Sequence, residues 1–345
     1  MRARRPGGAE VKSRSVDLQK LVLVGILAFV VVVFAILNPR FIRGTNIIYI
    51  LIQNSFVIIA GCAVTLLMIS GQIDLSIGST VCLSGMVFAY AARAGVPVGL
   101  SLLIALSVAL VVGLLNAVMV VKLHITPFIA TLGTMYMGRG LSYLVSDGLV
   151  IREGLPDKFS YLGTEDLGPI PITLVVLVVV VALFLVLERR SVLGKYSIAI
   201  GGNRTAAVLS GINSDGIVMT LYVLAGLFAG VAGVMQASRL AVGDPNIGIG
   251  FEFDVIVAVV LGGTSLAGGE GTIIGMIIGS LIIGSLGTGL KLLNVFTFFQ
   301  SIMKGIVLVL AVLLDQNLKA KLRAVMAARG GARPAGTGTA GMGAA

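Results

Sequence analysis

The stretch Val98–Val121 contains no charged side chain, and several other apolar runs in the chain are nearly as long. A helix needs about 20 mostly apolar residues to cross the hydrocarbon core of a bilayer, and only helices and closed barrels can span it. Just 12% of the 345 residues are charged, whereas a soluble domain carries about 25%. The sequence therefore predicts an all-α polytopic membrane protein embedded in a lipid bilayer.

Apolar runs and their breaks predict about eight to ten transmembrane or re-entrant helices. The runs that predict full spans are Leu21–Leu37, Ile47–Ile69, Val98–Val121, Ile172–Leu187, Ile217–Ala237, Thr272–Leu290 and Val295–Leu314. Shorter apolar helices are expected at Ser79–Ala92 and Phe251–Leu261. The polar, interrupted run Ile129–Val145 is a candidate partial or re-entrant span.

Basic residues gather at the two ends of the chain and in one interior loop. Lys- and Arg-rich segments stay on the cytoplasmic side of a membrane, which predicts cytoplasmic termini and accounts for the net charge of +10 without a nucleic-acid partner. Residues 1–20 are expected to form a basic tail, 21–315 the transmembrane domain, and 316–345 a disordered Gly/Ala-rich tail. The acidic stretch Ser146–Pro171 is expected on the outer side.

The segment Gly71–Ser79 places a carboxylate, Asp74, between two glycines and between long apolar runs. Charge at membrane depth is costly unless it lines water or finds a partner, and Gly71 and Gly78 allow the backbone to leave helical geometry. One interpretation is a hinge beside a pathway. The other is a short loop in which Asp74 caps the following helix through the amides of Ser76 and Gly78.

Several polar residues lie within or beside the apolar runs. Lipid would leave their polar groups without hydrogen-bond partners. We therefore expect them to face the bundle interior, and some to line a translocation path beside the hinge. The path and hinge candidates are Gln53, Asn54, Gly71, Asp74, Ser76, Gly78, Asn116, Asp254 and Gln300.

The basic loop Ser191–Gly216 contains the signals of one short helix. Asn203 is a good N-cap and Gly211 a plausible stop. The helix would lie along the membrane and present Ala206, Ala207 and Leu209 to a partner. A mere connecting helix is the alternative.

A faint internal repeat joins the two halves of the chain. In each half an acidic, Gly-broken segment leads to a Gly-rich helix, around Asp74 and around Asp254–Gly271. Each is followed by a related turn, Leu123–Thr126 and Leu293–Phe296. Repeats with discontinuous helices at matching positions are typical of transporters.

The motifs that usually carry catalysis or bind cofactors do not occur in the sequence. The glycines of Gly262–Gly269 lack the lysine of a phosphate-binding loop, and His124 is the one histidine. Cys62 and Cys82 have neither metal-ligand spacing nor the pattern of a disulfide framework. The sequence predicts no enzyme, no cofactor and no metal site.

Three blocks of the sequence resemble the permease subunits of bacterial ABC importers of the ribose type. They are Gly71–Ser79, Gly201–Asn213 and Val260–Gly269, and the likeness extends from about Leu21 to Asp315. It implies a permease homodimer in the bacterial inner membrane, a cytoplasmic ATPase subunit and a periplasmic sugar-binding protein. The expected cargo is a ribose-like pentose or a related sugar or polyol.

The resemblance also gives the short helix a role, because in such permeases a cytoplasmic helix sits in a cleft of the ATPase. Many members carry Glu before the paired alanines, where this chain has Thr205, so the details of that contact differ. The residues expected to couple to the ATPase are Gly202, Asn203, Arg204, Thr205, Ala206, Ala207, Leu209, Ser210, Gly211 and Ile212.

Other functions fit parts of the same pattern. Within the superfamily the alternatives are a branched-chain amino-acid or a nucleoside permease. A secondary transporter could use Asp74 or Asp254 as a proton or sodium site, but it has no use for a docking helix. A purely structural scaffold does not explain polar residues in mid-span.

Overall fold

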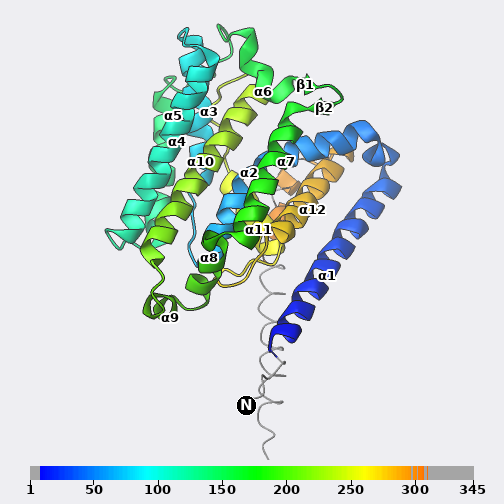
Figure 1. Cartoon of the computed structure of the whole chain (residues 1–345). Helices are drawn as coiled ribbons and strands as arrows, with labels where there is room; N and C mark the ends of the chain where they lie inside the picture. Colours follow the sequence, from blue (N-terminus) through cyan, green and yellow to red (C-terminus); the bar gives the residue numbers. More distant parts are fainter. Residues whose placement is uncertain (1–7, 297, 301, 307–308, 310–345) are drawn as a thin grey trace, which may run out of the picture.

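The computed structural model describes the chain except for residues 1–7, 297, 301, 307–308 and 310–345 (Figure 1). Within the described part, six helices are long and apolar enough to cross a membrane. These are α1 (Gly8–Leu37), α2 (Gly44–Ile69), α4 (Val98–Val121), α7 (Ile172–Arg190), α10 (Ser214–Leu240) and α12 (Ile273–Leu292). The all-α polytopic architecture predicted from the sequence is confirmed.

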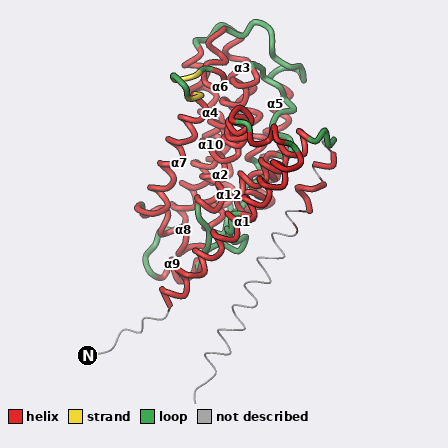
Figure 2. The backbone as a smooth tube through the Cα atoms, turned by 90° about the vertical axis from the view of Figure 1, so that its right-hand side faces the viewer, coloured by secondary structure: helices red, strands yellow, loops and turns green. Residues whose placement is uncertain are grey.

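Shorter elements complete the described fold. They are η1 (Pro39–Ile42), α3 (Ile77–Arg93), α5 (Pro127–Leu144), η2 (Asp157–Ser160), α6 (Tyr161–Thr164), α8 (Val192–Gly202), α9 (Arg204–Leu209), α11 (Phe251–Leu261) and the hairpin β1 (Asp166–Leu167) with β2 (Ile170–Pro171). The hairpin lies at the opposite end of the bundle from α8 and α9 (Figure 2). The predicted span Val295–Leu314 lies only partly within the described residues, and the C-terminal tail lies outside them.

Helix α10 is the centre of the bundle and packs against α2, α3 and α4. Small residues allow the close approach of α10 to α4. A side chain at Gly226 would meet the carbonyl oxygen of Ala109 and the backbone of Gly113, and one at Gly230 would meet the side chain of Ala109. Gly226 and Gly230 thus form a Gly-x-x-x-Gly packing face, in the manner usual for helices in lipid.

Two helices end in the same backbone turn. At the end of α2, Gly71 has φ +79° and the Gln72 amide donates to the Leu67 carbonyl. At the end of α11, Gly263 has φ +90° and the Thr264 amide donates to the Val259 carbonyl. This is the hydrogen-bond pattern that closes a helix on a left-handed glycine.

The related turns Leu123–Thr126 and Leu293–Phe296 also share a conformation. Their second residues, His124 and Asn294, both adopt left-handed backbone angles, with φ +56° and +57°. Few non-glycine residues do so. The repeat seen faintly in the sequence therefore has matching backbone turns in the two halves.

The expectation for Gly78 was wrong in its reason. Gly78 lies inside α3 and does not break it; the left-handed residue is Gly71. A side chain at Gly78 would instead collide with the Glu252 carboxylate and the Gly248 carbonyl. Glycine is required there for the close approach of α11 and the segment before it.

Candidate functional site

A chain of buried hydrogen bonds holds the segment between α2 and α3. Asp74 Oδ1 accepts from the Ser76 amide at 2.8 Å and from Ser76 Oγ at 2.6 Å. Ser76 Oγ in turn accepts from Asn116 Nδ2 of α4 at 2.8 Å. Thr134 Oγ1 of α5 donates to Asn116 Oδ1 at 2.7 Å. This series of hydrogen bonds links α4 and α5 to the break in the backbone between α2 and α3.

This network combines parts of both interpretations of the segment. Asp74 bonds the Ser76 amide as a loop residue would, while Ser76 is the N-cap of α3 without a side-chain cap bond of its own. The Tyr222 hydroxyl of α10 also donates to the Ile73 carbonyl at 3.1 Å. Asp74, Ser76 and Asn116 are each at most 2% exposed, so the network supports the segment from within. Thr134, a polar residue of the interrupted run, completes it.

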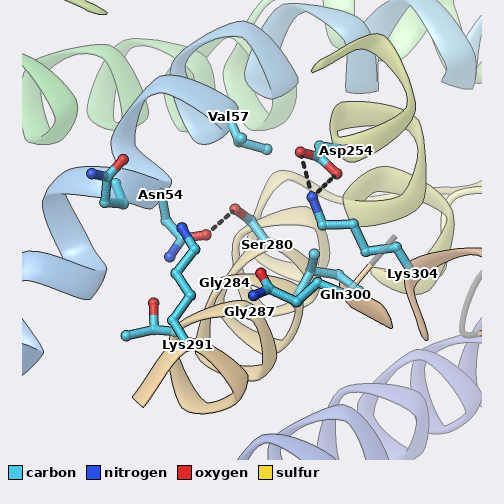
Figure 3. A pocket seen from close by; sticks show the side chains of 12 residues that line it. Asn54, Val57, Asp254, Ser280, Gly284, Gly287, Lys291, Gln300 and Lys304 are labelled. Carbon is cyan, nitrogen blue, oxygen red and sulfur yellow. Dashed lines mark hydrogen bonds and ion pairs between the residues drawn. The ribbon is translucent and has the colours of Figure 1, made fainter. Parts of the chain in front are cut away.

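The remaining polar candidates meet in a cavity of about 150 Å³ between α2, α11 and α12 (Figure 3). Gln53, Asn54, Asp254 and Gln300 all line it. Thus the structure divides the candidates of the sequence into a closed network around Asp74 and an open cavity around Asp254. The other lining residues are Val57, Ser280, Ile283, Gly284, Gly287, Thr288, Lys291 and Lys304.

Several polar groups of this cavity have partners within the protein. Lys304 Nζ lies 2.7 Å and 2.9 Å from the two carboxylate oxygens of Asp254 (Figure 3). Ser280 Oγ donates to Asn54 Oδ1 at 3.4 Å, and Gln300 Nε2 donates to the Val295 carbonyl at 3.0 Å. An ammonium group occupies the position that a sodium ion or a transferred proton would take at Asp254.

Gln53 was expected to lie inside the bundle, but it does not. Its side chain is exposed, and its amide donates to the Tyr49 hydroxyl at 3.1 Å. Asn54, the next residue, is 5% exposed and faces inward as predicted. Adjacent helical residues point about 100° apart, so only one of the two can face the same neighbour.

The short helix predicted in the basic loop is confirmed as α9. Asn203 Oδ1 accepts from the Ala206 amide at 2.9 Å, and Gly211 ends the turn with φ +82°. The sequence did not predict α8, which fills the first part of the same loop. Arg204 Nη2 and Asp215 Oδ1, 2.9 Å apart, connect α9 to the start of α10.

The outward surface of α9 agrees with the prediction at Ala206 and Leu209, which are exposed, and differs from it at Ala207. Ala207 is 5% exposed and belongs to the hydrophobic core of its own chain. Leu209 and Val208 are 84% and 53% exposed. Helix α9 therefore presents two large apolar side chains to its surroundings, while Ala207 anchors it.

The three sequence blocks that carried the resemblance meet next to α9. The Gly269 amide donates to the Ile69 carbonyl at the end of α2, at 2.7 Å. A side chain at Gly201 would collide with that same contact, and one at Gly268 would lie 2.8 Å from the Gly71 amide nitrogen. The end of α8, the turn after α2 and the loop after α11 thus touch through bare backbone.

Comparison with known proteins gives relatives over most of the chain. A family model described as "Branched-chain amino acid transport system / permease component" matches residues 46–312. The chain is 37% identical to the ribose import permease protein RbsC of Escherichia coli over 300 residues, which cover 86% of this chain and 92% of the relative.

Two further relatives cover a similar share. The RbsC protein of Bacillus subtilis is 38% identical over 85% of this chain and 92% of its own length. The L-arabinose ABC transporter permease protein AraH of Azospirillum brasilense is 39% identical over 87% and 89%. No solved structure matches the chain.

Proposed function

Because this chain belongs to the permease-component family of the branched-chain amino acid transport systems, we propose that it is the permease subunit of an ATP-binding-cassette importer for a monosaccharide. The observation that carries the sugar assignment is the set of relatives. Those named for ribose, L-arabinose and D-allose are 35–39% identical over at least 84% of this chain. A branched-chain amino-acid or nucleoside cargo remains the alternative within the family.

We assign ATP hydrolysis to a separate cytoplasmic subunit, since no phosphate-binding loop occurs in this sequence. Helix α9 is the proposed docking element. It exposes Leu209 and Val208 on a segment outside the apolar helices. It follows directly after α8, whose Gly201 contacts the end of α2 and the loop after α11. Closure of the ATPase would move α9 and, through these contacts, the two broken segments. The orientation that follows puts both termini in the cytoplasm of a bacterium and a periplasmic sugar-binding protein at the opposite end.

A second copy of the chain is proposed to face α5. This helix is not among the six that are long and apolar enough to span, yet Tyr136, Met137 and Leu144 on it are 55–71% exposed. Added side chains at Gly133 and Gly140 would meet nothing within 4 Å. Small residues on an exposed face suit approach by another helix in lipid. A translocation path between two copies of α5 would also give its polar groups access to water.

Within this scheme the remaining candidates take two roles. Gly71, Asp74, Ser76, Gly78 and Asn116 are proposed to hold the broken segment that moves during transport. The residues of the cavity around Asp254, including Gln53, Asn54 and Gln300, are proposed to provide a polar surface beside the path.

The proposal is tested by charge placed on α9. Leu209→Arg puts an unpaired charge into the proposed contact, which costs several kcal/mol when it is buried. We expect the variant to insert normally and to lose the co-purified ATPase. In vesicles reconstituted with the ATPase subunit and the sugar-binding protein, it should also lose ribose uptake.

The matched control is Leu167→Arg, an exposed leucine of the distant hairpin, which should keep the ATPase. Ala207→Arg is a poor test, because the buried Ala207 is part of the permease core. A wild-type chain that takes up sugar with no ATPase recovered, and is indifferent to Leu209→Arg, would favour a secondary transporter.

A further inference from the structure

A second cavity, of about 280 Å³, lies on the exposed side of α5. It is lined by Met135, Tyr136, Arg139, Tyr143, Ile249 and Glu252. Four of these residues belong to α5, Ile249 belongs to the segment that leads into α11, and Glu252 belongs to the first turn of α11. None of them was selected from the sequence, since the cavity exists only because this segment folds back onto α5.

The far wall of the cavity is firmly held. Arg139 donates from Nη1 to the Ile247 carbonyl at 2.8 Å and from Nη2 to the Gly248 carbonyl at 3.0 Å. The Tyr143 hydroxyl donates to Asn246 Oδ1 at 2.8 Å. Fixed walls are an advantage for a ligand, because little conformational entropy is lost when it binds.

Glu252 lines the cavity and has a carboxylate oxygen without a donor. Its side chain is 6% exposed, and its Oε2 atom is buried without a hydrogen-bond partner among the described residues. A buried polar atom without a partner is costly. The cost is relieved when a ligand brings a hydroxyl or amine proton to that oxygen.

Other groups of the cavity restrict the ligand. The Tyr136 side chain is 70% exposed, so its ring offers an apolar face with a polar tip. Met135 and Ile249 are apolar. The positive charge of the Arg139 guanidinium disfavours the binding of a cation beside Glu252. A mostly apolar wall with a few polar groups is typical of small-molecule sites, which usually enclose about 300–1,000 Å³. A small neutral molecule with several hydroxyl groups satisfies these conditions.

We propose that this cavity is a contact site for the transported monosaccharide, in which Glu252 accepts hydroxyl protons and the Tyr136 ring packs against the C–H face of the sugar. The inference rests on the proposed function and adds to it a defined place along α5. It also makes the permease a participant in sugar selection alongside any binding protein.

Cysteine protection tests this site in the complete transporter. The two native cysteines, Cys62 and Cys82, are 0% and 1% exposed, so Ile249→Cys introduces one accessible thiol into the cavity without removing a recognition group. Ribose, L-arabinose and D-allose are first ranked by uptake with the wild-type complex in vesicles. The sugar taken up fastest is then expected to slow the reaction of the thiol at position 249 with a water-soluble methanethiosulfonate several-fold.

A matched control and two added substitutions complete the design. In Tyr90→Cys, an exposed site of α3 outside the cavity, the same sugar should leave the reaction rate unchanged. Adding Glu252→Gln or Tyr136→Ala to Ile249→Cys should abolish protection. Glu252→Gln alone should raise the KM for uptake about tenfold, the effect of losing one hydrogen bond to a charged group.

The two possible failures are distinguishable. If a sugar that is taken up leaves the rate at position 249 unchanged, the site is overturned and the proposed function stands. If the assembled complex takes up none of the three sugars, the monosaccharide assignment fails, and the site assigned to that cargo fails with it.

Discussion

Helices α3 and α11 both begin inside the protein, and the carboxylates at their starts have opposite surroundings. Asp74, just before α3, is bonded to Ser76 and tied through it to Asn116. Glu252 and Asp254, in the first turn of α11, each face a cavity instead. The two halves share matching turns at the ends of α2 and α11, so the difference lies in the side chains rather than in the backbone plan.

The comparison indicates different roles for α3 and α11, the two half-helices. Negative charge is favourable at a helix N-terminus, so both starts can hold a carboxylate without a cation. At α3 the hydrogen bonds connect the carboxylate to neighbouring helices, which suits a supporting role. At α11 one carboxylate is neutralised by Lys304 and the other keeps a free buried oxygen. We infer that α11 provides contact with the cargo and α3 provides the frame.

The largest effect is expected where the two half-helices touch. In Gly78→Ala the added methyl group would meet the Gly248 carbonyl oxygen at 2.6 Å and collide with the Glu252 carboxylate. Overpacking typically costs about 1–3 kcal/mol, and a backbone contact that cannot rotate away places this site at the upper end. The purified permease should therefore melt at a clearly lower temperature.

Gly25→Ala in α1 is the control for Gly78→Ala, because its methyl group meets nothing within 4 Å and a helical Ala is favoured over Gly by about 0.5–1 kcal/mol. If both variants melted alike, the two half-helices would not be in the close contact described.

A smaller effect is expected at the neutralised carboxylate. Lys304→Met leaves Asp254 without its partner in a partly buried position, with side chains 35% and 29% exposed. The cost should be about 1–2 kcal/mol, between the values for exposed and for buried pairs. Adding Asp254→Asn to Lys304→Met should restore most of the lost stability, measured by thermal unfolding in detergent. A double variant no more stable than Lys304→Met would contradict the importance of this ion pair.

Much of this fold was predictable, because the length of apolar runs largely decides what crosses a bilayer. The runs Val98–Val121 and Phe251–Leu261 correspond residue for residue to α4 and α11. The direction in which individual side chains point was not predictable. Ala207 turned inward and Gln53 outward, since each depends on how its helix sits against the rest of the chain.

The site residues were predictable to different degrees, because some of them depend on how the helices pack. A polar residue inside an apolar run is visible in the sequence, and Asn54, Asn116 and Asp254 were predictable for that reason. Gly78 was misjudged because glycine serves equally a turn and a close approach. The cavity of Tyr136 and Glu252 requires that the segment before α11 folds back onto α5, which no local pattern indicates.

A still smaller effect separates the two carboxylates of α11. Glu252→Gln should change the free energy of unfolding by less than about 1 kcal/mol, because the Oε2 atom that it alters accepts no hydrogen bond from the described residues. Asp254→Asn should cost more, since it leaves the Lys304 ammonium beside a neutral amide. The two variants compared by the same thermal unfolding assay give the order directly, and a reversed order would show that Glu252 is the structural carboxylate.

The smallest effect is expected at Asp74. In Asp74→Asn the retained carbonyl oxygen can still accept from the Ser76 amide and hydroxyl, which are the contacts that hold the segment. Only the charge is lost, together with an Oδ2 atom that has no hydrogen-bond partner in the described chain. Sugar uptake should therefore stay within about twofold of the wild type, because less than about 0.5 kcal/mol is at stake. Uptake that vanished in an intact complex with continuing ATP turnover would mean that the negative charge itself is used in transport, and Asp74 would then belong with the working carboxylates of α11 rather than with the frame.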